Sequence, residues 1–239
     1  MCIGPVFFDA QFLEKFLSTR PRLHRYLLGI YFHYVRICRV ILQPDPAELN
    51  DCRVDVCDCR LLRKGCDHRL DLCFKVDPDP ERAALPAGSL LQRSDEAASL
   101  GLIRLRVKSL GTKLEYCHCC SCCCQALAVA RRLGPGYLVP SEALPETSLG
   151  CLRCGRCVAS CPVGARGSGK VDPARCLGCG ACVSACRRKA IQMQPRPVDA
   201  PARPEYRALP PLLLKALAFV ILVYVGFVNR RMHHHGHHH

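Results

Sequence analysis

The sequence predicts an α+β protein with three parts: a mixed α/β cysteine-rich domain, a small domain built on a repeated cysteine motif, and a C-terminal transmembrane helix. Three observations support this prediction. Cysteine accounts for 21 of the 239 residues, one cysteine motif occurs twice, and residues 212–228 are almost continuously apolar. Because 49% of the residues are hydrophobic, the chain is not wholly disordered.

The cysteines are predicted to bind metal rather than to form disulfides. Asp9, Glu14 and Lys15 interrupt the apolar residues near the N-terminus, which is unlike a secretory signal peptide. Disulfides persist mainly in oxidising compartments, and nothing directs this chain to one. The number of cysteines, 21, is odd, so they cannot all be paired in disulfides within the chain. The adjacent cysteines within residues 119–124 also cannot all reach separate disulfide partners.

Residues 1–43 are predicted to be an amphipathic helical segment. Apolar residues between Leu23 and Val35 recur at intervals of three and four, the spacing of one helix face, and arginines supply a cationic face. We expect this segment to pack on the next domain. The alternative is a helix that lies on an anionic membrane surface.

Residues 44–140 are predicted to form the cysteine-rich, metal-binding domain. Ser94 is expected to cap the N-terminus of a helix that ends at Gly101. Residues 103–107 alternate apolar and basic side chains, as a half-buried strand does. The densest cysteine run, CHCCSCCC, occupies residues 117–124.

The most specific motif is C-x2-C-x2-C-x3-C, found at residues 151–161 (the first motif) and 176–186 (the second motif). The two copies start 25 residues apart (176 − 151), and leucine, glycine and valine residues repeat at the same offset. Three thiolates at i, i+3 and i+6 on a tight loop can bind three corners of one iron–sulfur cube. The fourth cysteine begins a helix that leads away and ligates the other cluster. The predicted ligands are Cys151, Cys154, Cys157 and Cys186 for cluster 1, and Cys176, Cys179, Cys182 and Cys161 for cluster 2.

Residues 150–193 resemble the bacterial-type two-[4Fe–4S] ferredoxin domain. The resemblance implies a small pseudo-twofold α+β ferredoxin domain that passes single electrons. Cys186 is followed by Arg187, where the family usually has proline, and Arg188 and Lys189 continue the basic run. Positive charge beside an anionic cluster favours its reduced state, so we expect a raised potential there. A pair of zinc ribbons, the alternative, would need two C-x2-C pairs separated by a longer loop.

Nucleotide and flavin sites are not expected. Residues 164–170 begin like a phosphate-binding loop, but Val171 follows where a Ser or Thr would hold magnesium. The chain has no GxGxxG sequence either.

The remaining cysteines predict a third metal site. CDCR at residues 57–60, DEAASLGL at 95–102 and the 117–124 run precede the two-cluster domain, an order that resembles a group of ferredoxin-domain oxidoreductase-like proteins. An iron–sulfur cluster is favoured over zinc because the neighbouring sites are iron–sulfur. Its ligands would be chosen from Cys57, Cys59, Cys66, Cys73, Cys117, Cys119, Cys120, Cys122, Cys123 and Cys124. His118 is a candidate ligand as well, but a lone histidine beside cysteines is more often a surface group or one that supports the ligands. Cys2, Cys38 and Cys52 have no predicted role.

Residues 195–211 are predicted to be a Pro/Arg linker, and residues 212–228 a transmembrane helix. This apolar segment approaches the length of about 20 residues that a spanning helix needs. Its one charge, Lys215, can reach the interface. We expect a single-pass C-terminal anchor with the body on the cytoplasmic face, near anionic lipid. HHHGHHH at residues 233–239 is either a tag or natural.

The function predicted from these features is a membrane-anchored iron–sulfur electron-transfer protein. It would carry two [4Fe–4S] clusters and a third metal site, and relay electrons to or from a partner oxidoreductase of the membrane. The alternative is an oxidoreductase with a catalytic centre in the 117–124 run, fed by the ferredoxin domain. The net charge of +14 predicts an acidic partner surface. Nucleic acid is not expected as a partner, because Trp is absent and the charges are spread along the chain.

Overall fold

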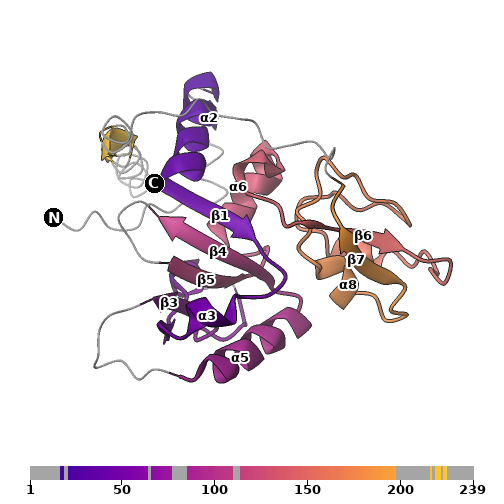
Figure 1. Ribbon diagram of the computed structural model, residues 1–239. Helices are drawn as coiled ribbons and strands as arrows, with labels where there is room; N and C mark the ends of the chain where they lie inside the picture. Colours follow the sequence, from indigo (N-terminus) through magenta and orange to yellow (C-terminus); the bar gives the residue numbers. More distant parts are fainter. Residues whose placement is uncertain are drawn as a thin grey trace, which may run out of the picture.

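The computed structural model (Figure 1) describes most of the body of the protein. The described residues are 17–18, 21–63, 66–76, 85–109, 114–197, 216, 219–221 and 223–224.

A five-stranded antiparallel sheet forms the centre of the N-terminal part. In spatial order its strands are β1 (Arg36–Val40), β4 (Ile103–Ser109), β5 (Leu114–Cys119), β3 (Cys73–Val76) and β2 (Cys52–Asp55). The strand predicted over residues 103–107 is confirmed as part of β4, with its apolar residues buried. Ile103 of β4 lies opposite Cys119 of β5, and Leu105 lies opposite Cys117. The register therefore carries two cysteines of the 117–124 run into the middle of a sheet.

Helices cover both faces of this sheet (Figure 1). One face packs on α2 (Pro21–Ile30), its π-helical continuation η1 (Tyr31–Val35) and α6 (Gln125–Leu133). The other face packs on α3 (Pro46–Leu49) and α5 (Ala87–Ser99). The short helix α4 (Asp58–Arg63) follows β2, and the 3-10 turn η2 (Pro135–Tyr137) follows α6.

Two helix boundaries differ from the prediction. The described N-terminal helix ends at Ile30, and residues 36–40 form β1, in which Cys38 and Val40 are buried on either side of the exposed Arg39. Helix α5 begins at Ala87, so Ser94 is a buried residue inside the helix and not its N-cap. The predicted end is close, since α5 ends at Ser99 and Gly101, two residues later, has a left-handed φ of +78°.

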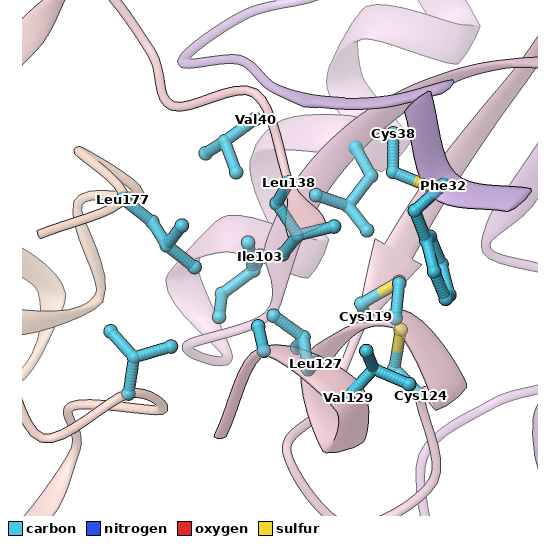
Figure 2. Close-up of a cluster of buried hydrophobic side chains, with 14 of the residues drawn as sticks. Phe32, Cys38, Val40, Ile103, Cys119, Cys124, Leu127, Val129, Leu138 and Leu177 are labelled. Carbon is cyan, nitrogen blue, oxygen red and sulfur yellow. The ribbon is translucent and has the colours of Figure 1, made fainter. Parts of the chain in front are cut away.

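The repeated motif lies in a smaller C-terminal lobe, beside the main sheet. Its strands β6 (Ala143–Thr147) and β7 (Ile191–Pro195) pair antiparallel, and its helices are α7 (Arg156–Ala159) and α8 (Ala181–Ser184). Leu177 of this lobe belongs to the same core as Val40, Ile103 and Leu127 of the N-terminal part (Figure 2). The two parts therefore share one hydrophobic core.

The prediction of a C-terminal transmembrane helix is wrong. In the described part of the chain, no helix has the length and apolar character needed to cross a membrane. Most of residues 212–228 lies outside the described residues, but Ile221 is buried in the main core at 1% exposure. Tyr224 also forms a 2.9 Å hydrogen bond with His24 of α2. The sequence-based argument assumed that no other part of the protein could pack against this apolar segment, whereas Ile221 lies in the main core and Tyr224 contacts α2.

The predicted membrane localisation, with a single-pass anchor and a cytoplasmic body, rested on that helix and is corrected with it. Of the predicted linker at residues 195–211, only residues 195–197 are described. Arg196 is bonded to the lobe and does not belong to a detached linker: its guanidinium donates to the Cys176 carbonyl at 2.8 Å and to the Ser141 carbonyl at 3.0 Å. The C-terminal histidine run at residues 233–239 lies outside the described residues.

Candidate iron-sulfur and metal centres

The duplicated sequence folds into a duplicated backbone. Helices α7 and α8 begin at equivalent positions after Gly155 and Gly180, whose φ values are +76° and +77°. Other left-handed residues also come in pairs at the 25-residue offset of the two motifs (178 − 153 and 189 − 164). These pairs are Arg153 with Gly178, and Gly164 with Lys189. Because a left-handed φ is unfavourable for Arg and Lys, its presence at equivalent positions indicates that both loops need the same turn.

The loop of the second motif is held against β6 by close packing at Gly178. A Cβ atom built on Gly178 would lie 2.1 Å from the Ser141 Oγ and 2.3 Å from the Ala143 carbonyl oxygen. The Ser141 hydroxyl in turn donates to the Gly178 carbonyl at 2.6 Å. Only glycine fits this position, and its contact with β6 fixes the loop that carries Cys176 and Cys179.

Four of the predicted ligands line one open cavity, here named the repeat cavity. They are Cys161, Cys176, Cys179 and Cys182. The other lining residues are mainly apolar, including Val163, Leu177 and Ala181. Cys161 belongs to the first motif, yet the fold places it in the cavity of the second. This is the exchange of the fourth cysteine that the spacing predicts, although the assignment of each ligand stays a prediction.

Backbone amides point at the sulfur atoms of the repeat cavity. The Ala165 amide donates to the Cys161 Sγ at 3.2 Å, and the Gly178 amide donates to the Cys176 Sγ at 3.4 Å. Burial raises the pKa of Cys179 to about 12 and that of Cys182 to about 11. Binding of iron must therefore displace protons from these thiols. The donor set fits an iron–sulfur cube: four convergent sulfurs, amide donors to them and an apolar wall.

A buried arginine that the sequence reasoning missed lies on the wall of this cavity. Arg166 is 5% exposed, and its guanidinium donates to the Thr147 hydroxyl. Burial raises the pKa of Cys182, and the positive charge of Arg166 partly offsets this effect. Nothing in the local sequence distinguishes Arg166 from the exposed arginines around it; only its burial does.

The remaining predicted ligands, Cys151, Cys154, Cys157 and Cys186, lie nearer the surface. Cys154 is exposed and the other three are half-buried. The Cys151 Sγ accepts a hydrogen bond from the Arg153 amide at 3.4 Å, as Cys176 does from Gly178. Leu152, on the same loop, is 68% exposed. The first motif thus repeats the local geometry of the second on a more exposed loop.

The ten cysteines predicted for a third site divide into two groups, and none of the described cysteines is in a disulfide. Four Sγ atoms lie within 4.8 Å of one another, a group that we name the turn cluster. Its members are Cys66, Cys120, Cys122 and Cys123. The other six thiols form a row of neighbours, the thiol chain, which runs through Cys57, Cys73, Cys117, Cys119, Cys124 and Cys59.

Strand alternation and a tight turn produce this division. Cys117 and Cys119 project from one face of β5, and the sulfur of Cys119 lies beside that of Cys124 (Figure 2). The chain then turns at residues 121–123, where the Cys124 amide donates to the Cys120 carbonyl at 3.2 Å. This turn separates Cys120, Cys122 and Cys123 from the thiol chain.

His118 is not at the surface and does not lie among the sulfurs. Because side chains alternate along a strand, His118 faces the side of the sheet opposite to Cys117 and Cys119. It is 1% exposed, and its Nε2 is hydrogen-bonded to the Ser94 Oγ at 2.8 Å. Burial lowers the pKa of His118 to about 4. His118 is therefore a neutral group of the core.

Arg60 is a second buried arginine that the sequence reasoning gave no role. It is 2% exposed and donates to the carbonyls of Arg69, at 2.8 Å, and His118. Burial lowers the pKa of its guanidinium, but the neighbouring thiols of Cys57, Cys73 and Cys120 outweigh this and raise it. Its position in the CDCR sequence, directly after Cys59, was the one available signal.

The comparisons with known proteins agree with the geometry of the C-terminal lobe. Residues 170–192 match the family model of the 4Fe-4S binding domain. No curated protein matches the chain. The matched segment carries all four cysteines of the second motif and ends within β7. The C-terminal lobe therefore contains an iron–sulfur domain of the ferredoxin type, which binds at least one [4Fe–4S] cluster.

Proposed function

We propose that this protein is an electron carrier with two [4Fe–4S] clusters, which relays single electrons to or from a partner oxidoreductase. The observation that carries the proposal is the duplicated backbone, in which left-handed residues and short helices recur at the 25-residue offset of the motifs (180 − 155). Cluster 2 would be held by the repeat cavity. By the same symmetry, Cys151, Cys154, Cys157 and Cys186 would hold cluster 1.

The chain's own residues suit electron transfer. A bound [4Fe–4S] cluster supplies a one-electron redox centre whose potential depends on nearby charge, hydrogen bonds to sulfur and solvent exposure. Here the Ala165 and Gly178 amides stabilise negative charge on sulfur, and Arg166 adds a buried positive charge. All three favour the reduced state of cluster 2.

The surface around the motifs suits an acidic partner. The basic side chains Arg153, Arg156, Arg187, Arg188 and Lys189 are all exposed. Such a basic surface would steer an acidic redox partner toward the lobe and raise the rate of association at low salt. The exposed loop of the first motif would then be the point of electron entry or exit.

The alternative of a catalytic centre in the 117–124 run is less well supported. Cys119 and Cys124 are 9% and 5% exposed, so a substrate has little access to these members of the thiol chain. A transfer role for the lobe needs no such access, because electrons tunnel through the protein.

Iron and acid-labile sulfide analysis after anaerobic purification tests the proposal. We expect about eight irons per chain and two one-electron reductions with dithionite, followed by EPR. A content of about four irons would leave a single cluster and refute the two-cluster proposal. About twelve would add a third cluster, with the thiol chain as its site, and would advance the catalytic alternative.

A further inference from the structure

We propose that the turn cluster binds a single zinc ion through four thiolates, at a site separate from the iron–sulfur clusters. This inference stands independently of the proposed function, because its residues belong to the N-terminal part. It also replaces the expectation of an iron–sulfur cluster at the third site, as far as these four cysteines are concerned.

The spacing of the sulfur atoms carries the proposal. All four Sγ atoms lie within 4.8 Å of one another, and those of Cys66 and Cys120 are 3.4 Å apart. Four sulfurs at the corners of a tetrahedron, each about 2.3 Å from a central zinc, are separated by about 3.8 Å. An iron–sulfur cube holds its ligand sulfurs farther apart, because each one binds a different iron. The turn cluster therefore has the dimensions of a one-ion site.

The backbone supports these side chains independently of any metal. Three of the four cysteines lie on the turn between β5 and α6, which is closed by the hydrogen bond from the Cys124 amide to the Cys120 carbonyl. Arg131 of α6 also donates to the Ser121 carbonyl and fixes the outer side of the turn. Cys66 approaches from the loop after α4. Cys122 is exposed whereas Cys120 and Cys123 are buried, so an ion can reach the site from solvent.

The charge around the turn cluster suits an anionic centre. Zinc with four thiolates has a formal charge of two minus four, or about −2. Arg60 is buried beside Cys120, and its Nε has no hydrogen-bond partner within the described part of the chain. A buried guanidinium is costly unless a negative group offsets its charge. A zinc–thiolate centre supplies that negative charge.

The location indicates a structural role. Cys120 and Cys123 belong to a small core with Leu72, Ala97 and Leu102. This core joins the loop before β3 to the end of α5, and α5 contacts the C-terminal lobe through a 3.2 Å hydrogen bond from the Ser184 hydroxyl to the Ala98 carbonyl. Because so few apolar side chains hold these segments, a closed four-thiolate site would contribute directly to their folding.

Metal analysis of the full chain, purified anaerobically and dialysed against a chelator, tests the proposal. We expect about one zinc per chain in the wild type. In the double variant Cys66→Ser/Cys122→Ser, we expect the zinc content per chain to fall by about tenfold or more. The iron and sulfide contents should not change. Cys52→Ser is the matched control, because Cys52 lies outside both groups and donates to the Glu48 carbonyl as a serine hydroxyl can. This control should retain both metals.

X-ray absorption at the zinc edge of the wild type keeps the test independent of any variant that fails to fold. Four sulfur neighbours at about 2.3 Å are expected. The proposal is overturned if the wild type lacks zinc, if zinc has nitrogen or oxygen neighbours, or if the double variant loses iron instead. A wild-type protein that contains zinc but no iron would refute the proposed electron-transfer function and would still support the zinc site.

Discussion

The two cysteine-rich regions of this protein use the same side chain in opposite ways. In the C-terminal lobe, three sulfurs of each predicted ligand set come from one short loop, and the 25-residue offset of the motifs (176 − 151) repeats in the backbone. In the N-terminal part, Cys66 meets Cys120 across 54 residues, and alternation along β5 places Cys117 and Cys119 together on one face. Predicted ligands that are close in sequence are therefore recognisable before folding, whereas cysteines brought together from distant segments are not.

Cys161 provides the strongest test of this contrast, since it is the one predicted ligand lining the repeat cavity that lies outside the second motif. We expect Cys161→Ala to remove the cluster of the second motif, with a loss of about half of the iron. Iron and sulfide analysis with EPR of the reduced protein measures this. Cys52→Ala serves as the control and should keep its iron. If Cys161→Ala instead removed the cluster of the first motif, the predicted exchange of ligands would be wrong.

Substitution of Gly178 tests whether the repeat cavity depends on its contact with β6. Gly178→Ala introduces a Cβ that meets Ser141 and the Ala143 carbonyl, at a φ of +65°. We expect the free energy of unfolding to fall by about 2–4 kcal/mol, measured by anaerobic denaturation. Gly169 is the matched control: its φ is +80°, but a Cβ would meet nothing within 4 Å. Gly169→Ala should therefore cost only about 1–2 kcal/mol. Equal losses would show that the close contact is unimportant.

The buried charge at Arg166 should affect the potential more than the exposed charges of the same lobe. We expect Arg166→Gln to lower the reduction potential of cluster 2 by tens of millivolts, roughly, because a positive charge that favours the reduced state is lost. Anaerobic redox titration followed by EPR measures the shift. Arg175→Gln is a control, since Arg175 is exposed and water screens its charge. A similar shift in both variants would argue against a specific effect of burial.

The packing of the C-terminal segment predicts the smallest effect. Tyr224→Phe removes the hydrogen bond with His24 but keeps the ring, so we expect a loss of about 1 kcal/mol in the free energy of unfolding. Tyr26→Phe, at a residue 57% exposed, should change stability little. Chemical denaturation of both variants makes the comparison. If Tyr224→Phe were neutral, the hydrogen bond between Tyr224 and His24 would not contribute to stability.

Whether a sequence-based inference was correct depended on how far apart in the chain the interacting residues lie. The strand over residues 103–107 could be predicted because alternation is a local pattern, and Gly101 marks the nearby helix end for the same reason. The start of α5 could not, since Ser94 resembles a cap until its burial against Arg104 and His118 is known. The apolar C-terminal segment resembled a membrane helix because the contact of Tyr224 with His24 of α2 spans 200 residues of the chain.

The sequence by itself determined the repeated motif, its relation to the 4Fe-4S binding domain and the abundance of thiols available to metal. These follow from the spacing of cysteines within loops of a few residues, where chain stiffness leaves little choice of geometry. Only the tertiary structure decided which of the ten other cysteines meet, and that Arg60 and Arg166 are buried beside sulfur. The physical reason is that strand register, helix packing and burial depend on segments far apart in the chain.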